Sequence, residues 1–148
     1  MAALIPNIAK GKFAYYAGLP AANDALIWRL YSGTETDANI RDTDTAASMT
    51  ALAVDDATFT GYSPQTATGV VVTVDDTNDR VDADAADPSW SPTTAQALTR
   101  IGLFCDPDTT VGTDADLLPL FVDDFALTTP TSGTVGYTVN AAGFARAA

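Results

Sequence analysis

The chain has 148 residues, of which 47% are apolar and 18% charged, a composition typical of one globular domain and unlike that of a disordered chain. Nineteen acidic residues stand against seven Lys and Arg, so the formal net charge is −12. Because nucleic-acid binding depends on Lys and Arg that neutralise phosphates, this balance argues against a nucleic-acid partner.

The residue types favour strands joined by turns. All but one of the acidic residues are Asp, which prefers turns and helix caps to helix interiors. There is no His, and the single Cys105 lies in an apolar run, so we expect a buried, unreactive thiol. No stretch approaches the roughly 20 apolar residues of a membrane-spanning helix, and the N-terminus lacks the basic-then-apolar order of a signal peptide. We therefore expect no membrane partner and folding in a cytoplasm.

The chain is expected to divide into an N-terminal arm and one domain. Residues 1–12 are small and mostly apolar, with one Pro and two Lys. Such a segment predicts an arm that lies on its own domain or on a neighbouring subunit, and a frayed terminus is the alternative. Residues 13–148 show no internal repeat and no linker, and we expect them to form a single β-sandwich domain.

Three elements are predicted before the middle of the chain. Residues 13–17 predict a short strand, because aromatic side chains fall on both faces and Gly and Pro follow. Residues 24–31 fit a buried strand about as well as two helical turns, and their Ile, Trp and Tyr favour the strand. Residues 46–54 have apolar side chains at three- and four-residue spacings, with an N-cap available at residues 42–44, and predict a short crossing helix.

The clearest element is a β-hairpin over residues 68–85. Its first strand, residues 70–74, is almost wholly apolar and is expected to lie centrally in a sheet. Asp and Asn in residues 75–79 supply the turn. The return strand, residues 80–85, alternates apolar with charged side chains, so one of its faces is expected to face water. Trp90 is large enough to close one end of the core.

Further strands are predicted at residues 57–62, 97–105, 117–122 and 136–140. Pro119 places its strand at a sheet edge or at a bulge. The tail over residues 143–148 consists mostly of small residues, and Phe144 is its candidate anchor. Seven or eight short strands at this spacing, with one crossing helix, predict an all-β fold: an antiparallel β-sandwich.

Two acidic loops, residues 75–87 and residues 106–116, are candidates for a calcium site, and the second is the better candidate. Calcium needs six to eight oxygen ligands, and the EF-hand loop has Gly at its sixth position and Glu at its twelfth. Counted from Asp106, the sixth residue is Val111, Gly112 comes one place late, and no acid stands twelfth. Acidic loops are more often solvated turns, so no metal is predicted. The weak candidate ligands are Asp106, Asp108, Asp114 and Asp116.

No pattern of catalytic residues is found, and neither an enzyme nor a cofactor is predicted. The neighbouring carboxylates Asp55 with Asp56, and Asp123 with Asp124, should point to opposite faces of a strand, so neither pair converges on a substrate. Without His there is no hydrolase triad. No glycine-rich phosphate loop is present.

Aromatic residues concentrate near the N-terminus. They could form a sugar-binding platform, but packing in the core or at a subunit interface is the favoured interpretation. We therefore expect self-association through the arm and these aromatic residues. The candidate interface residues are Ile5, Ile8, Phe13, Tyr15, Tyr16 and Phe144.

Several segments, taken in order, resemble a known family. They read ALI-x-x-LYSG (25–33), ATFTGY (57–62), TGVVVTVDDTNDRVDADAADPSW (68–90), IGLFCDPDT (101–109), DLLPLFVDDFAL (116–127) and YTVNAAGF (137–144). This pattern is similar to small virion structural proteins of tailed bacteriophages. The likeness covers most of the chain, consists of strands, aromatic residues and turns, and carries over no functional residue.

The resemblance implies a β-sandwich located in the virion and assembled in the bacterial host cytoplasm. It implies a non-enzymatic capsid decoration (cement) protein on the outer surface of the head, or alternatively a neck or tail accessory protein. The implied partners are the major capsid protein or other virion structural proteins. A homo-oligomer is expected, with a trimer suggested by the local three-fold sites of capsid lattices. A host-surface or glycan-binding module is the second alternative.

Overall fold

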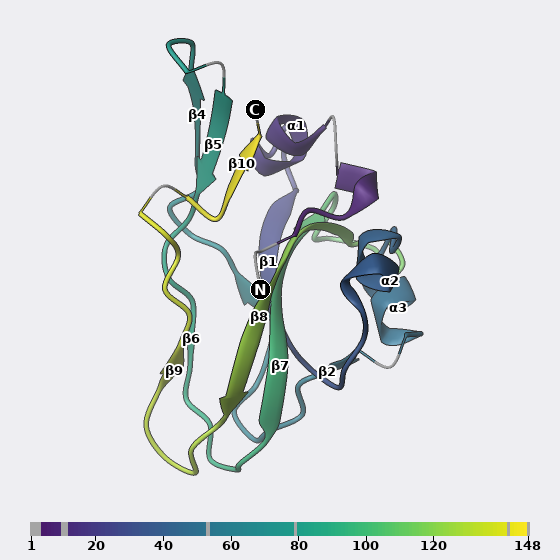
Figure 1. The fold of residues 1–148 in the computed structure, drawn as a ribbon, viewed down its shortest axis with the longest axis vertical. Helices are drawn as coiled ribbons and strands as arrows, with labels where there is room; N and C mark the ends of the chain where they lie inside the picture. Colours follow the sequence, from purple (N-terminus) through teal and green to yellow (C-terminus); the bar gives the residue numbers. More distant parts are fainter. Residues whose placement is uncertain (1–3, 10–11, 53, 79, 142, 148) are drawn as a thin grey trace.

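The computed structural model describes residues 4–9, 12–52, 54–78, 80–141 and 143–147 (Figure 1). It is an all-β fold with antiparallel sheets and short helices, as the sequence predicts. Over the described residues, the strand count is ten rather than seven or eight, because several strands have only two residues.

The central sheet is built on three long antiparallel strands. Its order is β2–β1–β7–β8, and β3 also pairs with β1. The strands predicted over residues 24–31 and 97–105 are confirmed, and the latter lies inside the sheet. The bounds are β1 (Ala25–Ser32), β2 (Asp55–Asp56), β3 (Gln65–Thr66), β7 (Ala97–Asp106) and β8 (Leu118–Thr128).

Two small sheets cover one face of the central sheet (Figure 1). One has the order β10–β5–β4 and the other pairs β6 with β9. The core between the layers centres on Trp28, whose ring contacts those of Phe121, Tyr137 and Phe144. Trp90 is buried at the same core, as predicted. The bounds are β4 (Val71–Asp75), β5 (Arg80–Asp84), β6 (Ser89–Trp90), β9 (Val135–Gly136) and β10 (Ala145–Ala147).

Short helices cover the opposite face (Figure 1). There Tyr31, Phe104 and Val122 of the sheet pack with Ile40 and Met49 of the helices. Side chains alternate along β1, so Trp28 enters the sandwich core while Tyr31 enters this second core. The helices on this face are α2 (Asp37–Arg41) and α3 (Ala46–Thr50), while η1 (Asn7–Ala9) and α1 (Phe13–Ala17) lie near one end of the sheets.

The prediction of a strand over residues 13–17 is wrong, because the segment is helix α1. The N–H of Tyr16 donates to the Lys12 carbonyl, and the N–H of Gly18 donates to the Ala14 carbonyl. Phe13 and Ala17, four residues apart, are buried on one side while Tyr15 is exposed. One helical turn therefore accounts for apolar side chains that also fitted an extended strand.

The strands predicted at residues 57–62 and 136–140 are also wrong in whole or in part. Residues 57–62 are irregular, although Phe59 is buried, since the N–H groups of Thr58 and Phe59 donate to the Gln96 side chain. Of the last segment, only Gly136 is in a strand, and the N–H of Val139 donates to the Asp87 carboxylate. Side chains replace a neighbouring strand as hydrogen-bond partners in both places.

The hairpin over residues 68–85 is confirmed, but its first strand is not central. β4 lies at the edge of its sheet, and Val71 and Val74 are 55% and 66% exposed. The chain end causes the difference: β10, which the sequence did not predict, pairs with β5 on the other side. Phe144, just before β10, is buried in the sandwich core, as an anchor would be.

The predicted crossing helix is confirmed as α3, although it ends at Thr50. Its N-cap is Thr45 rather than a residue among 42–44. The Thr45 hydroxyl accepts from the N–H of Ser48, and the Ser48 hydroxyl accepts from the N–H of Thr45. This reciprocal capping box satisfies two backbone donors, which explains why the helix begins there.

Strand β8 has both features that Pro119 predicts, a position at the sheet edge and an irregularity in its pairing. β8 is an edge strand of the central sheet, and its register with β7 shifts beside Pro119. The described part of the arm then covers part of this edge, because Leu4 and Val122 exchange backbone hydrogen bonds of 2.8 and 3.0 Å. Leu4 of the arm therefore pairs with its own domain.

Gly102 in β7 is expected to tolerate no larger residue. A Cβ atom there would lie 2.7 Å from Cε2 of Phe104 and 3.4 Å from Cε2 of Tyr31. Gly102→Ala should therefore displace the Phe104 ring and lower the free energy of unfolding by about 1–3 kcal/mol. Chemical denaturation measures this loss. Gly136→Ala is the control, since its nearest contact is 3.7 Å away, and an equal loss in both variants would contradict the packing argument.

Candidate functional site

Two arginines are buried on the helix-covered face of the central sheet. Arg29 of β1 and Arg100 of β7 are only 5% and 6% exposed. The sequence analysis did not single them out. The sequence pattern that indicates them is a single cation inside each of two apolar strands. A charge is buried in a core only where carboxylates or carbonyls pair with it.

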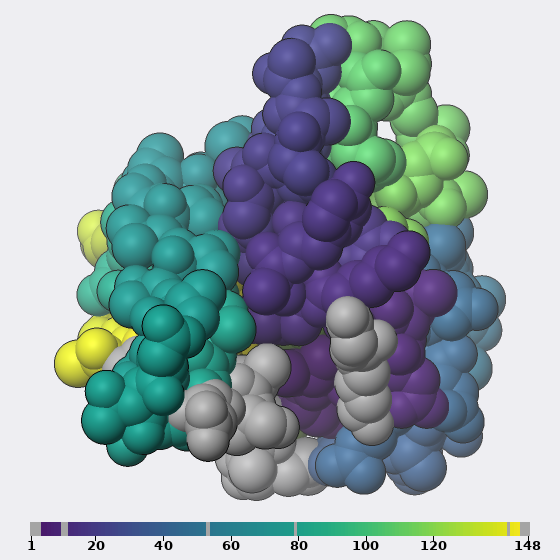
Figure 2. Space-filling view, turned by 90° about the horizontal axis from the view of Figure 1, so that it is seen from above, coloured from purple at the N-terminus to yellow at the C-terminus, as the bar shows by residue number. Residues whose placement is uncertain are grey.

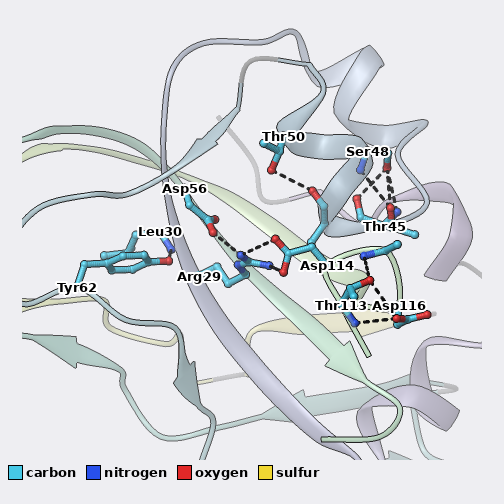
Figure 3. Close-up of polar contacts among 12 residues, drawn as sticks. Arg29, Leu30, Thr45, Ser48, Thr50, Asp56, Tyr62, Thr113, Asp114 and Asp116 are labelled. Atoms are coloured by element: carbon cyan, nitrogen blue, oxygen red, sulfur yellow. Dashed lines mark hydrogen bonds and ion pairs between the residues drawn. The ribbon is translucent and has the colours of Figure 1, made fainter. Parts of the chain in front are cut away.

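Arg29 is held by two carboxylates from distant segments (Figure 3). Its two terminal nitrogens donate to both oxygens of Asp114, at 2.9 and 3.1 Å, and one of them also contacts Asp56. Burial by itself lowers the pKa of Arg29, but hydrogen bonds and charges from Asp114 and Asp56 outweigh it and raise the pKa. Burial raises the pKa of Asp56, and the Arg29 charge opposes that shift. The arginine therefore stays charged and ties strand β2 and the loop of residues 106–116 to β1.

Arg100 ties helix α2 to the central sheet in the same way. Its guanidinium donates to Asp124 at 3.1 Å, to Asp37 at 3.2 Å and to the Glu35 carbonyl at 2.9 Å. Asp37 is the first residue of α2. These contacts satisfy a buried charge and position a helix, which is a structural role.

The loop weighed as a calcium site has its carboxylates engaged elsewhere. Asp106 and Asp108 accept from the backbone N–H groups two residues ahead of them. Asp114 binds Arg29, and Asp116 accepts from the N–H of Thr113 (Figure 3). Across the described ranges, no group of three or more potential metal ligands is found. The structure does not bring the four candidate ligands together.

The two carboxylate pairs diverge as the strand geometry predicts. Asp123 accepts a hydrogen bond from the Tyr137 hydroxyl at 2.8 Å, whereas Asp124 contacts Arg100 on the other face of β8. Asp56 contacts Arg29, while Asp55 is exposed. Neither pair presents two carboxylates to a common point.

Cys105 is buried as predicted. It belongs to the sandwich core and is free of any disulfide. Burial raises the pKa of its thiol to about 12, so the nucleophilic thiolate is not formed at neutral pH.

The candidate interface residues separate into buried and exposed groups. Phe13 and Phe144 are buried and their rings contact each other, so neither presents a surface to a partner. Ile5 and Tyr16 are partly buried against the same core. Ile8 and Tyr15 are exposed, at 38% and 60%. Tyr15 also meets the Tyr16 ring edge-on beside an open hollow that includes Lys12.

Most of the exposed apolar side chains lie at one end of the molecule, which we call the upper face. It consists of η1, α1, the β4–β5 hairpin and the loop of residues 106–116, which Figure 2 shows together. Leu127 lies towards the other end, near the end of β8 (Figure 1). Among residues whose burial the structure describes, the upper face holds five of the six exposed large apolar side chains: Ile8, Tyr15, Val71, Val74 and Val111.

No family model, curated protein or solved structure matches this chain. Within the described ranges, the helices are all too short to cross a membrane. The upper face is therefore the candidate site that the geometry itself provides, and its chemistry suits a protein–protein contact.

Proposed function

We propose that this chain is a non-enzymatic bacteriophage structural protein that decorates the outer surface of the head. In this proposal the upper face contacts the major capsid protein, and the rest of the acidic surface faces solvent. The proposal combines the sequence resemblance with the geometry of the upper face. A neck or tail position is the alternative location for the same kind of contact.

The observation that carries the proposal is the concentration of exposed apolar side chains on the upper face. Scattered apolar residues are ordinary on protein surfaces, but a group at one end is typical of an interaction site. Tyr15 is the expected anchor, because it is the most exposed aromatic side chain there and Tyr is enriched at interface hot spots.

A buried arginine holds part of this face in place. Asp114 lies in the loop that carries Val111, and Arg29 binds both of its carboxylate oxygens. A loop tied to a core strand loses little conformational entropy when it binds a partner. This rigidity suits a subunit that attaches repeatedly to a fixed lattice.

A binding assay with heads that lack the chain tests the proposal. Purified protein should bind these heads, and Tyr15→Ser or Ile8→Ser should weaken binding at least about tenfold. Leu127→Ser removes a similarly exposed apolar side chain at the opposite end and is the matched control. Equal binding by all variants would mean that the upper face is not the contact.

Antibody–gold labelling of intact virions tests the location. Label spread over the head supports decoration. Label confined to the neck or tail would move the contact to that part of the particle. Particles without label would contradict a virion role.

A glycan-binding module is the second candidate, favoured by the exposed Tyr15 beside Lys12. Aromatic rings can stack on sugar faces, and a cation can bind an acidic sugar. Glycan-array binding that Tyr15→Ser abolishes, together with no binding to heads, would favour this function over decoration.

A further inference from the structure

The open edge of β4 has backbone groups that point away from its own sheet. On β5, the Ala83 carbonyl accepts from the N–H of Phe144, on the side of β10. Successive residues of a strand direct their backbone groups to opposite sides, so Asp82 and Asp84 face β4. The hydrogen bond from the N–H of Ala86 to the Thr68 carbonyl agrees with this alternation.

The register then identifies the open groups. Asp82 pairs with Thr73 and Asp84 with Val71, so these two residues of β4 direct their backbone groups to β5. Val72 and Val74 consequently direct theirs to the open edge. Outside the strand pairings, none of the backbone hydrogen bonds of the described residues involves Val72 or Val74.

This edge lacks most of the features that normally prevent strand pairing. Edge strands are usually protected by Pro, charged side chains, a bulge, or a covering segment, and of these β4 has only Asp75 at its end. β4 reads VVTVD, pairs with β5 without a register shift, and projects at one end of the molecule (Figure 1). Val71 and Val74 expose apolar side chains on its two faces.

We infer that β4 pairs antiparallel with β4 of a second copy of this chain, around a two-fold axis at Thr73. This register aligns all five residues of the strand and places Val72 opposite the partner's Val74, and Val74 opposite the partner's Val72. Both residues of each pair direct their N–H and C=O groups outward, so every open donor meets an acceptor. The side chains of these pairs lie on one face of the joined sheet and are all apolar.

The strand itself indicates a second copy as the occupant, because about this one point its open backbone groups pair with each other and Val72 meets Val74 in both copies. Each copy carries a net charge of −12, so two copies repel each other. Salt should therefore strengthen this contact, whereas it would weaken a contact with a basic partner. The contact does not depend on the virion role, and failure of the labelling experiment would leave it standing.

Sedimentation over a range of protein concentrations tests the pairing. The wild-type chain should form a dimer, and its dissociation constant should fall when salt rises from about 0.1 M to about 1 M, where the Debye length drops from about 10 to about 3 Å. Val74→Pro removes the outward N–H from both copies, and the loss of two hydrogen bonds should raise the dissociation constant about thirtyfold. Val74→Lys tests the same edge without changing the backbone.

Disulfide trapping tests the register. Thr73→Cys should cross-link two folded copies, because residues opposite each other in a non-hydrogen-bonded antiparallel pair have Cα atoms about 4.5 Å apart. Val71→Cys is the matched control, since in this register it faces the partner's Asp75 and its symmetry mate is out of reach. The native thiol, Cys105, is buried and should not react.

Three results would overturn the inference. The first is a monomer at every concentration and salt. The second is a dimer or trimer that Val74→Pro and Val74→Lys leave unchanged. The third is cross-linking of Val71→Cys as efficient as that of Thr73→Cys.

Discussion

Arg29→Met is expected to lower the free energy of unfolding by about 3 kcal/mol at neutral pH. The substitution keeps a long apolar side chain in β1 but removes the cation that Asp56 and Asp114 share. Asp114 is exposed enough to be hydrated by water, whereas Asp56 is more than half buried and would keep an uncompensated charge. The cost therefore comes mainly from Asp56.

The loss should depend on pH in a direction that identifies Asp56. Burial raises the pKa of Asp56 above its usual 3.8, and loss of Arg29 should raise it further. A carboxyl whose folded-state pKa is raised favours the folded state when protonated and loses that contribution as pH rises through this pKa. The variant should therefore be closest to wild type at about pH 4 and furthest from it at about pH 7.

Chemical denaturation at both pH values measures this effect. Arg29→Met combined with Asp56→Leu removes the charge with its partner and should recover at least half of the lost stability. Asp114→Asn is the control, because solvent reaches this second partner of Arg29. Its free energy of unfolding should fall by about 1 kcal/mol or less. A loss in Arg29→Met that is the same at both pH values would contradict the assignment to Asp56.

Above about pH 9 the fold should lose stability steeply. Burial raises the pKa of Cys105 to about 12, raises that of Tyr62 to about 12, and raises those of Tyr31 and Tyr137 as well. Each group stays protonated in the folded state while its unfolded counterpart ionises, so its contribution is present below the unfolded pKa and is lost as pH rises. Between its unfolded and its folded pKa, each group lowers the stability by about 1.4 kcal/mol per pH unit.

Two tyrosine variants separate the hydroxyl groups involved. The Tyr31 hydroxyl is buried and has no hydrogen-bond partner among the described residues, so Tyr31→Phe should stabilise the fold by about 1 kcal/mol. The Tyr62 hydroxyl accepts from the N–H of Leu30 at 3.1 Å, so Tyr62→Phe leaves that donor unsatisfied and should destabilise by about 1–2 kcal/mol. Both variants should shift alkaline unfolding, followed by circular dichroism and tyrosinate absorbance, to higher pH relative to their own neutral-pH stability. Equal effects of the two variants at neutral pH would contradict the hydrogen-bond assignment.

The candidate site was only partly predictable. The exposed Tyr15 and Ile8 belong to the arm and aromatic segment that the sequence analysis selected, but Phe13 and Phe144, selected for the same apolar character, are buried together in the core. An apolar side chain fits a core and an interface equally well. The difference depends on whether a distant segment covers it, and local sequence does not contain that information.

The sequence by itself determined the all-β class, the long strands β1 and β7, the hairpin and the divergence of Asp123 from Asp124. Each of these follows from local alternation, turn residues or the two faces of a strand. Only the tertiary structure decided that Phe13–Ala17 is helical, that β4 lies at an edge, and that Arg29 joins Asp56 to Asp114. These features depend on segments far apart in the chain. A pattern of one turn fits a helix and a strand equally well, so packing against distant residues decides between them. Strand β4 lies at an edge because the chain end pairs with the other side of β5.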